Sequence, residues 1–364
     1  MRSTVAAFTD TYLPTVNGVT YTVKTWRDRW ESRGGRMDIV YPRSEHTPAA
    51  GEYPVTSAPF PFYNGFRIGF PRIPDAVSDV DIVHAHTPFG LGVGGLRLAN
   101  KKTEKPLVVS YHTPTEEYAA YLTERSIARY VVHVSTAYEN WYLNHADHII
   151  TPSENTRDRL TDRVNPPISV VPNGIDVERF TPTDTDEFRD RFDLPDGPLV
   201  GYTGRHGYEK RLCDILDATA GLDVTVVFAG DGPARSRLEA RAETTNVDVQ
   251  FLGFLDREDL PAFYSVLDVF AFPSPVETQG LVALEANACG TPVVGVEQGA
   301  LADTIIDGQT GYHFPPCDID EFRTAILRAL EKRKSLSSSC LDRRGDISVE
   351  QSVDQLEAVY ERVV

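Results

Sequence analysis

Two glutamates separated by seven residues could bind one ligand at two points. Glu277 comes before Gly280 and Leu281, and Glu285 comes after them. Residues 269–271 predict a strand and residues 280–288 a helix, whose first backbone N–H groups, on Gly280 and Leu281, suit a phosphate. At about 1.5 Å of rise per helical residue, the carboxylates could lie about 10 Å apart. That spacing suits hydroxyl groups at both ends of a diphosphate, as in a sugar nucleotide.

A pair of cations follows another predicted strand. Arg205 and Lys210 come directly after the apolar residues 199–202. A guanidinium and an ammonium group can approach a diphosphate from two directions and stabilise its charge. Surface cations on a loop are the plainer interpretation, but in so acidic a half of the chain their position beside a strand end favours a binding role.

The first half of the chain adds two segments at strand ends. Residues 3–9 predict a strand that leads to Tyr12, Asn17 and Gly18, where a helix is predicted to begin and the backbone can approach a ligand closely. His112 follows the predicted strand 107–111. A histidine is more often structural and a glycine can simply begin a helix, yet the strand-end position favours a role in a site.

The elements that position these residues alternate along the chain. Apolar runs predict strands at residues 3–9, 37–41, 81–85, 107–111, 148–151 and 168–171, and again at 199–202, 224–229, 249–252, 269–271 and 292–294. Helical patterns, such as residues 18–33, lie between them. The alternation predicts an α/β fold of parallel, doubly wound sheets, with ligands at the carboxyl ends of the strands.

The chain is long enough for two domains. Its 364 residues fit two domains of about 150–200 residues, and the strand pattern restarts after residue 172. We therefore expect domains at 1–172 and 173–345. Residues 346–364 form a separate amphipathic helix, with Val349, Val353, Leu356 and Tyr360 on one face.

The charge is distributed unevenly. Residues 1–172 have 18 basic and 18 acidic side chains, so the whole net charge of −17 belongs to residues 173–364. This charge argues against nucleic acid as a partner. The acidic excess, with 7 Lys against 29 Arg, fits a protein adapted to high salt, and an acidic protein of an ordinary cytoplasm is an equal alternative.

Other features narrow the class of protein. The four cysteines form no Cys-x-x-Cys pair, which argues against a zinc site or a disulfide framework. The apolar runs are too short to span a bilayer, and the first residues lack a secretory pattern. We expect a cytoplasmic protein that could still bind the surface of the cell membrane.

The segment around Glu277 and Glu285 resembles the Glu-x7-Glu motif of the retaining family 4 glycosyltransferases. These enzymes have the GT-B fold, in which two Rossmann-like domains face a central cleft. The segment from Gly204 to Lys210 resembles the Gly-Arg…Glu-Lys segment of the same family. The resemblance extends over nearly the whole chain and includes Ala-Gly-Asp231-Gly-Pro, which is similar to a loop around the nucleotide.

The resemblance implies a role for each site residue. Glu277 would bind hydroxyl groups of the donor sugar, and Glu285 the ribose. Gly280 and Leu281 would bind the β-phosphate, and Arg205 and Lys210 would stabilise the leaving diphosphate without a metal ion. Further donor contacts would come from Gly18, Asp231 and, beside the reacting carbon, His112. Domain 1–172 would bind the acceptor, 173–345 the nucleotide sugar, and helix 346–364 would cross back to the first domain. The reaction would retain the anomeric configuration and need no cofactor.

The acceptor is the least specified part. Residues 52–71 are rich in aromatic side chains, which either form ordinary strands and turns or an apolar lip for a lipid or lipid-linked glycan. Tyr12, Asn17, Phe62 and Tyr63 are candidates on the acceptor side. Because the first half has no net charge, an anionic membrane would repel it less than it would repel an acidic domain.

Other functions fit less well. The glycines of residues 90–95 do not follow the first strand, which argues against NAD. His84 and His86 could suggest a metal, but they have no third ligand nearby in the sequence. Asp79 and Asp81 are interpreted as a turn before a buried strand. A nucleotide-sugar epimerase, a synthase of the same fold and a non-catalytic binding subunit remain the alternatives.

Overall fold

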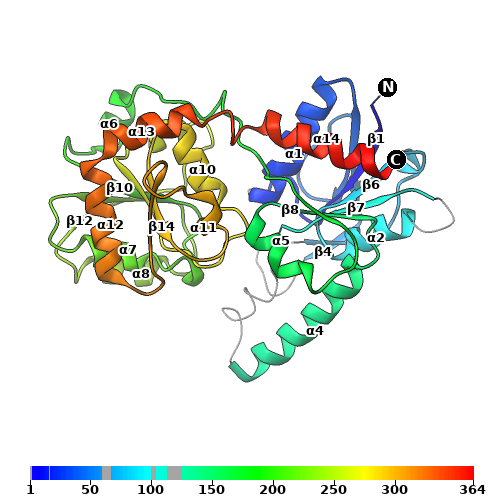
Figure 1. Cartoon of the computed structure of the whole chain (residues 1–364), viewed down its shortest axis with the longest axis horizontal. Coiled ribbons are helices and arrows are strands. Elements are labelled where there is room, and N and C mark those ends of the chain that lie inside the picture. Colours follow the sequence, from blue (N-terminus) through cyan, green and yellow to red (C-terminus); the bar gives the residue numbers. More distant parts are fainter. Residues whose placement is uncertain (1, 16, 60–66, 100–103, 113–124) are drawn as a thin grey trace. The chain divides into compact units, whose positions relative to one another are not determined.

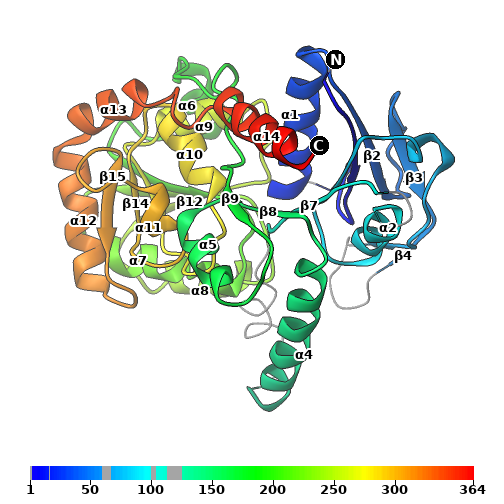
Figure 2. The same cartoon turned by 45° about the vertical axis from the view of Figure 1, so that its right-hand side comes forward.

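The computed structural model describes residues 2–15, 17–59, 67–99, 104–112 and 125–364, with the backbone alone for 125–133. These residues form two compact units, one of residues 1–174 with 349–364 and one of residues 175–348. Both are drawn in Figure 1 and, turned by 45°, in Figure 2. Each unit is described by itself below. None of the helices in the described part of the chain combines the length and the apolar character that crossing a bilayer requires.

The first unit is built on a seven-stranded sheet in the order β3-β2-β1-β6-β7-β8-β9, and all six pairings are parallel. Its strands are β1 (Thr4–Phe8), β2 (Arg36–Pro42), β3 (Glu52–Val55), β6 (Ile82–Ala85), β7 (Leu107–Ser110), β8 (His148–Thr151) and β9 (Ile168–Val170). The strands β4 (Ser57–Pro59) and β5 (Arg67–Gly69), which follow β3 in the sequence, form a separate antiparallel pair. The helical elements are α1 (Gly18–Ser32), the 3₁₀ turn η1 (Asp75–Val77), α2 (Gly90–Leu98), α4 (Arg125–Leu143), α5 (Glu154–Thr161) and α14 (Val349–Val363).

The second unit has a six-stranded sheet in the order β12-β11-β10-β13-β14-β15, again parallel throughout. Its strands are β10 (Leu199–Thr203), β11 (Thr225–Ala229), β12 (Asp248–Gly253), β13 (Val269–Phe272), β14 (Val293–Val296) and β15 (Gly311–Phe314). The helical elements are α6 (Asp186–Phe192), the 3₁₀ turn η2 (Tyr208–Lys210), α7 (Cys213–Thr219), α8 (Arg235–Ala242), α9 (Leu260–Val266), α10 (Leu281–Ala288), α11 (Leu301–Thr304), α12 (Ile319–Glu331) and α13 (Arg333–Asp342).

The sequence explains why both sheets are parallel. Strands such as β1, β10 and β11 are apolar along nearly their whole length and buried on both faces, which parallel sheets require because helices cover both sides. Helix α12 buries Phe322, Ala325, Ile326 and Ala329, spaced as one face of a helix. The prediction of two α/β, doubly wound domains is confirmed.

In each sheet the chain adds strands first on one side of the first strand and then on its other side. We call the place where this order reverses the direction change of the sheet. In the first unit β1 is bonded to β2 on one side and to β6 on the other. In the second unit β10 lies between β11 and β13 in the same way. In sheets of this kind the loops leaving such a pair of strands diverge to opposite faces and leave a crevice, which is where ligands bind.

The last helix belongs to the first unit. Helix α14 packs against α1, and Figures 1 and 2 both show the two side by side. Trp26 Nε1 of α1 donates to Ser352 Oγ at 2.9 Å, and the rings of Trp30 and Tyr360 meet edge to face with centroids 5.2 Å apart. Arg33 forms ion pairs with Glu350 and other carboxylates of α14. Residues 346–348 belong to the second unit, and the chain returns to the first unit at residue 349, where α14 begins.

Candidate functional site

The predicted cations and the first glutamate meet at the direction change of the second sheet. Arg205 and Lys210 follow β10, and Glu277 lies in the loop after the neighbouring strand β13. Lys210 Nζ forms an ion pair with Glu277 Oε1, and both side chains are largely buried, at 12% and 13% exposed. The pair therefore joins the two strand-end loops across the crevice where a ligand of this fold binds.

Arg205 is held by a residue that the sequence analysis did not single out. Its guanidinium pairs with Glu209, a carboxylate that is only 5% exposed, while Arg205 itself is 35% exposed. The buried carboxylate orients the cation, and the guanidinium remains accessible to solvent. Glu209 lies inside the Gly-Arg…Glu-Lys segment, so the signal for it was present in the motif.

The loop with Asp231 packs directly on the loop with Arg205. His206 N donates to the backbone oxygen of Asp231 at 2.8 Å, and Ala234 N donates to the backbone oxygen of His206 at 2.8 Å. A Cβ atom on Gly230, whose φ is +109°, would lie 2.1 Å from the backbone oxygen of Gly204. Only glycine permits this approach of the two loops. The side chain of Asp231 accepts a hydrogen bond from Gly232 N and is exposed.

Gly280 forms the N-cap of α10 rather than its first residue. Its φ of +76° is left-handed, and a Cβ atom there would lie 2.8 Å from Leu301 Cδ2, so a side chain would be strained in two ways. Leu281 begins the helix and is partly buried. The first turn contains no acidic residue, so the positive end of the helix dipole remains available to an anion.

Glu285 is buried one turn further along α10, where two residues hold it. Tyr264 Oη donates to Glu285 Oε2 at 2.7 Å, and Arg257 Nη1 lies 3.7 Å from Glu285 Oε1. Burial raises the pKa of Glu285, while Arg257 and the tyrosine hydroxyl act in the opposite direction. Nothing in the sequence around Tyr264 signals this role, because the residue lies on a different helix, α9.

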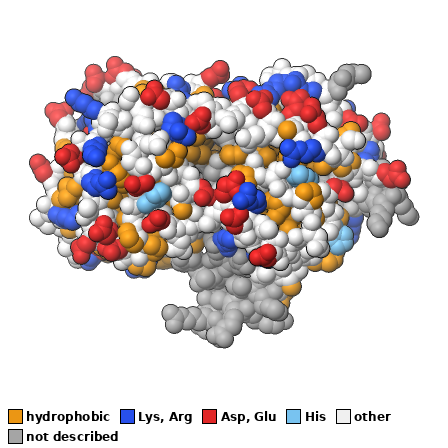
Figure 3. Space-filling view, in the orientation of Figure 1, with side chains coloured by type: hydrophobic (Ala, Val, Ile, Leu, Met, Phe, Trp, Pro, Cys, Tyr) orange, Lys and Arg blue, Asp and Glu red, His pale blue; other side chains and the backbone are white. Residues whose placement is uncertain are grey.

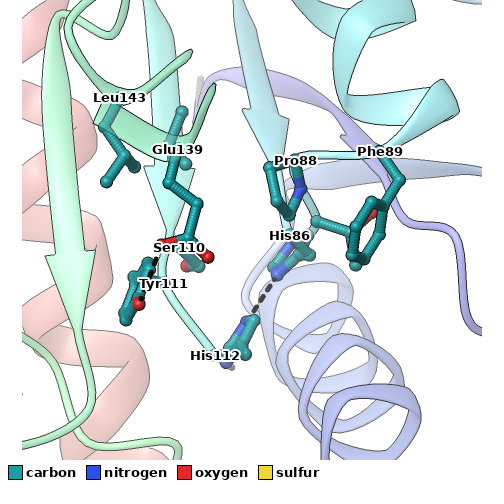
Figure 4. A pocket seen from close by; sticks show the side chains of 10 residues that line it. His86, Pro88, Phe89, Ser110, Tyr111, His112, Glu139 and Leu143 are labelled. Atoms are coloured by element: carbon teal, nitrogen blue, oxygen red, sulfur yellow. Dashed lines mark hydrogen bonds between the residues drawn. The ribbon is translucent and has the colours of Figure 1, made fainter. Parts of the chain in front are cut away.

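The predicted residues of the first unit lie at the direction change of its sheet. His112 follows β7 and belongs to a buried group of imidazoles with His84 and His86, the latter directly after β6. His86 Nδ1 and His112 Nε2 are 3.1 Å apart, and their rings stack at an angle of 10°. Figure 4 shows the two rings pointing toward each other in a small pocket that Pro88, Tyr111 and others line. Burial lowers the pKa of His112 to about 4.

The loop between β1 and α1 uses its polar side chains for its own fold. Asn17 is the N-cap of α1: its Oδ1 accepts from Thr20 N at 2.9 Å, and its Nδ2 donates to Thr11 Oγ1 at 2.7 Å. Tyr12 is buried, and its hydroxyl donates to Glu52 at 2.8 Å. Gly18 begins α1 and is exposed, and its contact with the donor stays a prediction. Acceptor binding by Tyr12 and Asn17 stays a prediction.

The other acceptor-side candidates, Phe62 and Tyr63, lie outside the described residues. The aromatic segment around them includes β3, β4 and β5, and Phe70 at its end is 54% exposed. Among the described residues, no group of three or more His, Cys, Asp or Glu side chains is arranged to hold a metal ion.

Two solved structures that share this architecture are a sucrose-phosphate synthase and HepE. Sucrose-phosphate synthase of Thermosynechococcus elongatus superposes with a TM-score of 0.80 at 22% identity, over 100% of this chain and 99% of the other. HepE of Anabaena, solved with UDP-glucose, superposes with a TM-score of 0.77 at 17% identity over the full length of both chains. At these identities the likeness establishes the fold, which is the GT-B class.

The family follows from the sequence comparisons. Residues 16–179 match the family described as Glycosyltransferase Family 4, and residues 184–340 match the family described as Glycosyl transferases group 1. Alpha-monoglucosyldiacylglycerol synthase of Streptococcus pneumoniae is 29% identical over 84% of this chain and 74% of its own length. GDP-mannose-dependent alpha-mannosyltransferase of Mycolicibacterium smegmatis is 28% identical over 98% of both chains. The chain belongs to glycosyltransferase family 4, as its motifs predicted.

Proposed function

We propose that this glycosyltransferase moves a hexose from a nucleoside-diphosphate sugar to a hydroxyl group of a membrane lipid or lipid-linked glycan, with retention of the anomeric configuration. The observation that carries the proposal is the ion pair between Lys210 and Glu277 at the direction change of the second sheet. It brings together a cation for the diphosphate and a carboxylate for the sugar hydroxyls, beside the accessible guanidinium of Arg205.

The proposed donor site is contained in the second unit. Arg205, Lys210 and the N-terminus of α10 at Gly280 and Leu281 would bind the diphosphate and stabilise the charge that develops on it as the glycosidic bond breaks. Glu285 would accept hydrogen bonds from the ribose. This set supplies positive charge to the leaving group from the protein itself, so we propose a reaction without a metal ion.

His112 of the first unit is proposed to contact the donor sugar. Since its pKa is about 4, it is neutral near pH 7 and acts as a hydrogen-bond partner rather than as a cation. We assign no covalent nucleophile, and displacement from the face of the leaving group is the mechanism that these residues support. The names of the two relatives above, a glucosyldiacylglycerol synthase and a mannosyltransferase, support a glycolipid or glycan product.

An exposed aromatic face of α4 supports the lipid acceptor. Val134, Tyr138 and Trp141 follow one another at helical spacing and are 49%, 36% and 49% exposed. Figures 1 and 2 show this helix projecting from the first unit. Tryptophan and tyrosine favour the boundary between lipid and water. We propose that this face, together with the electroneutral first half of the chain, contacts the cytoplasmic surface of the membrane.

Two experiments test these proposals. A thermal-shift screen with UDP, GDP and their hexose conjugates, in low and high salt, should find one nucleotide that raises the melting temperature. Mass spectrometry should then detect a hexose added to diacylglycerol or polyprenyl-linked acceptors, with loss of activity in Arg205→Ala. Interconversion of free nucleotide sugars would instead identify an epimerase, and binding without turnover a non-catalytic subunit.

The membrane contact has its own test. The protein should float with anionic liposomes, and the double variant Tyr138→Ser with Trp141→Ser should float less. The matched control is Tyr208→Ser, since that tyrosine is 51% exposed but lies in the second unit. A protein that stays entirely in solution with such liposomes at its working salt concentration would contradict the membrane contact.

A further inference from the structure

The two histidines at the end of β6, His84 and His86, differ in how many hydrogen-bond partners their rings have. His84 uses both ring nitrogens: Nδ1 lies 2.7 Å from Tyr360 Oη and Nε2 lies 2.8 Å from Ser110 Oγ. His86 uses only Nδ1, which lies 3.1 Å from His112 Nε2. Its other nitrogen, Nε2, is buried and has no hydrogen-bond partner among the residues that the structure describes.

The surroundings hold the ring of His86 in place. Its centroid lies 4.0 Å from that of His84 and 5.9 Å from that of Trp26 of α1, and the residue is 1% exposed. A rotation of the ring by 180° would replace Nδ1 by a carbon and break the contact with His112. The observed orientation is therefore the one that bonds to His112, as Figure 4 shows.

Proton accounting then decides which ring donates. A neutral imidazole has one N–H and one bare nitrogen. If His112 Nε2 donated to His86, the N–H of His86 would be at Nε2, buried and without an acceptor. If His86 Nδ1–H donates, the unpaired atom is a bare nitrogen. In protein backbones, buried N–H groups without an acceptor are rarer than buried acceptors with an unused lone pair, and we apply the same preference to the imidazole. Burial lowers the pKa of both rings, so both are neutral near pH 7 and this accounting applies.

We infer that His86 is a positioning residue, which donates its Nδ1–H to His112 Nε2 and so holds His112 in the tautomer with its proton on Nδ1. The ring of His112 then carries its N–H at Nδ1, and its Nε2 lone pair is occupied by His86. Resting on the proposed function, this means that His112 meets the donor sugar as a hydrogen-bond donor to an oxygen atom, and that the protein selects this state before the sugar binds.

The first test reads the tautomer directly and needs no activity. The full chain is labelled with ¹⁵N-histidine, and two-bond ¹H–¹⁵N correlations are recorded at neutral pH. The chain has nine histidines, so His86→Asn and His112→Asn identify the two spin systems. We expect both rings to have a protonated Nδ1 and a bare Nε2. A protonated Nε2 on His112 would overturn the inference, whatever the enzyme's reaction.

The second test separates positioning from packing. His86→Leu removes the donor, and we expect kcat to fall about tenfold or more, the cost of one lost hydrogen bond at the reacting centre, with little change in the KM of the donor. In His86→Asn, the side-chain Nδ2 takes the place of the imidazole Nδ1 and can donate, so kcat should stay within about threefold of the wild type.

A neighbouring histidine supplies the matched control. His84→Leu removes a fully buried imidazole from the same strand and loses two hydrogen bonds, but none of them is to His112. We expect a melting temperature as low as that of His86→Leu and a much smaller loss of kcat. Equal losses of kcat in the two leucine variants, or no rescue by His86→Asn, would overturn the inference. An inactive wild type would instead refute the proposed function, and the tautomer measurement would still stand.

Discussion

The ion pair between Lys210 and Glu277 predicts opposite effects of two substitutions on a free nucleoside diphosphate. Glu277→Ala removes a carboxylate that neutralises Lys210. Lys210→Ala removes the cation and leaves Glu277, which then repels a diphosphate. We therefore expect Lys210→Ala to weaken the binding of both the diphosphate and its sugar conjugate. Glu277→Ala should reduce only the additional affinity that the sugar conjugate has over the free diphosphate.

The structure gives the scale of the effect. Both side chains are nearly buried, so solvent screens the pair only partly. Two unit charges about 4 Å apart interact by about 4 kcal/mol at an effective dielectric constant of about 20. A hydrogen bond to a charged group contributes about 1.5–3 kcal/mol net. Lys210→Ala should thus raise the Kd of the diphosphate about 10- to 100-fold. Glu277→Ala should leave this Kd unchanged or lower it.

Isothermal titration calorimetry with the diphosphate and with its hexose conjugate measures both quantities. Two substitutions with the same charge changes serve as controls, Lys332→Ala at an exposed position and Glu239→Ala, which breaks an exposed pair with Arg235. If Glu277→Ala weakens the free diphosphate as much as Lys210→Ala does, the pair acts as a structural unit. The assignment of Lys210 to the phosphate and Glu277 to the sugar would then be wrong.

Four further outcomes follow from other contacts. Tyr264→Phe removes the hydroxyl that donates to Glu285, and should lower the free energy of unfolding of the second unit by about 1–3 kcal/mol in urea. Burial raises the pKa of Glu285 above 4.5, so the stability that this group contributes is present below that pH and lost as the pH rises. The Tyr264 hydroxyl opposes this rise because it bonds to the charged carboxylate. The loss in Tyr264→Phe should therefore be larger at neutral than at acid pH, and an equal loss would contradict this. Burial likewise raises the pKa of Asp10 from 3.8 to about 6, so the stability that it contributes below pH 3.8 is lost as the pH rises through about 6. That loss amounts to about 3 kcal/mol, which the uncharged Asp10→Asn should not show, and parallel urea-unfolding curves against pH for the two proteins would refute it. Gly280→Ala places a Cβ atom on a residue with φ of +76°, 2.8 Å from a side-chain atom, and should lower the melting temperature and weaken nucleotide binding. Gly345→Ala, where the added Cβ atom meets open space, should change neither quantity. Finally, Figure 3 shows acidic and basic side chains interspersed on the surface, and the net charge of −17 lies in residues 173–364, so the melting temperature should rise as KCl increases from about 0.1 to about 2 M, and a falling one would argue against adaptation to salt.

Strand positions were largely predictable because apolar runs report burial in a parallel sheet. Strand β8 occupies the predicted residues 148–151, and β10 and β13 end within a residue or two of the predicted ends. Strand β15 was missed: its sequence, Gly311–Phe314, contains a histidine and no continuous apolar run. Its conformation depends on pairing with β14, which sequence periodicity does not encode.

The sequence by itself determined which residues stand at strand ends, because local apolar runs specify the strands and parallel strands share one edge. It therefore indicated Arg205, Lys210, Glu277 and His112, and its motifs indicated the family. Only the tertiary structure decided which side chains bond to each other. Glu209 orients Arg205, Tyr264 holds Glu285, and His86 bonds to His112 across neighbouring strand ends. The motif already contained Glu209, but Tyr264 and His86 lie on other elements than their partners, and their spacing along the chain carries no signal. Burial in a medium of low dielectric constant strengthens these bonds.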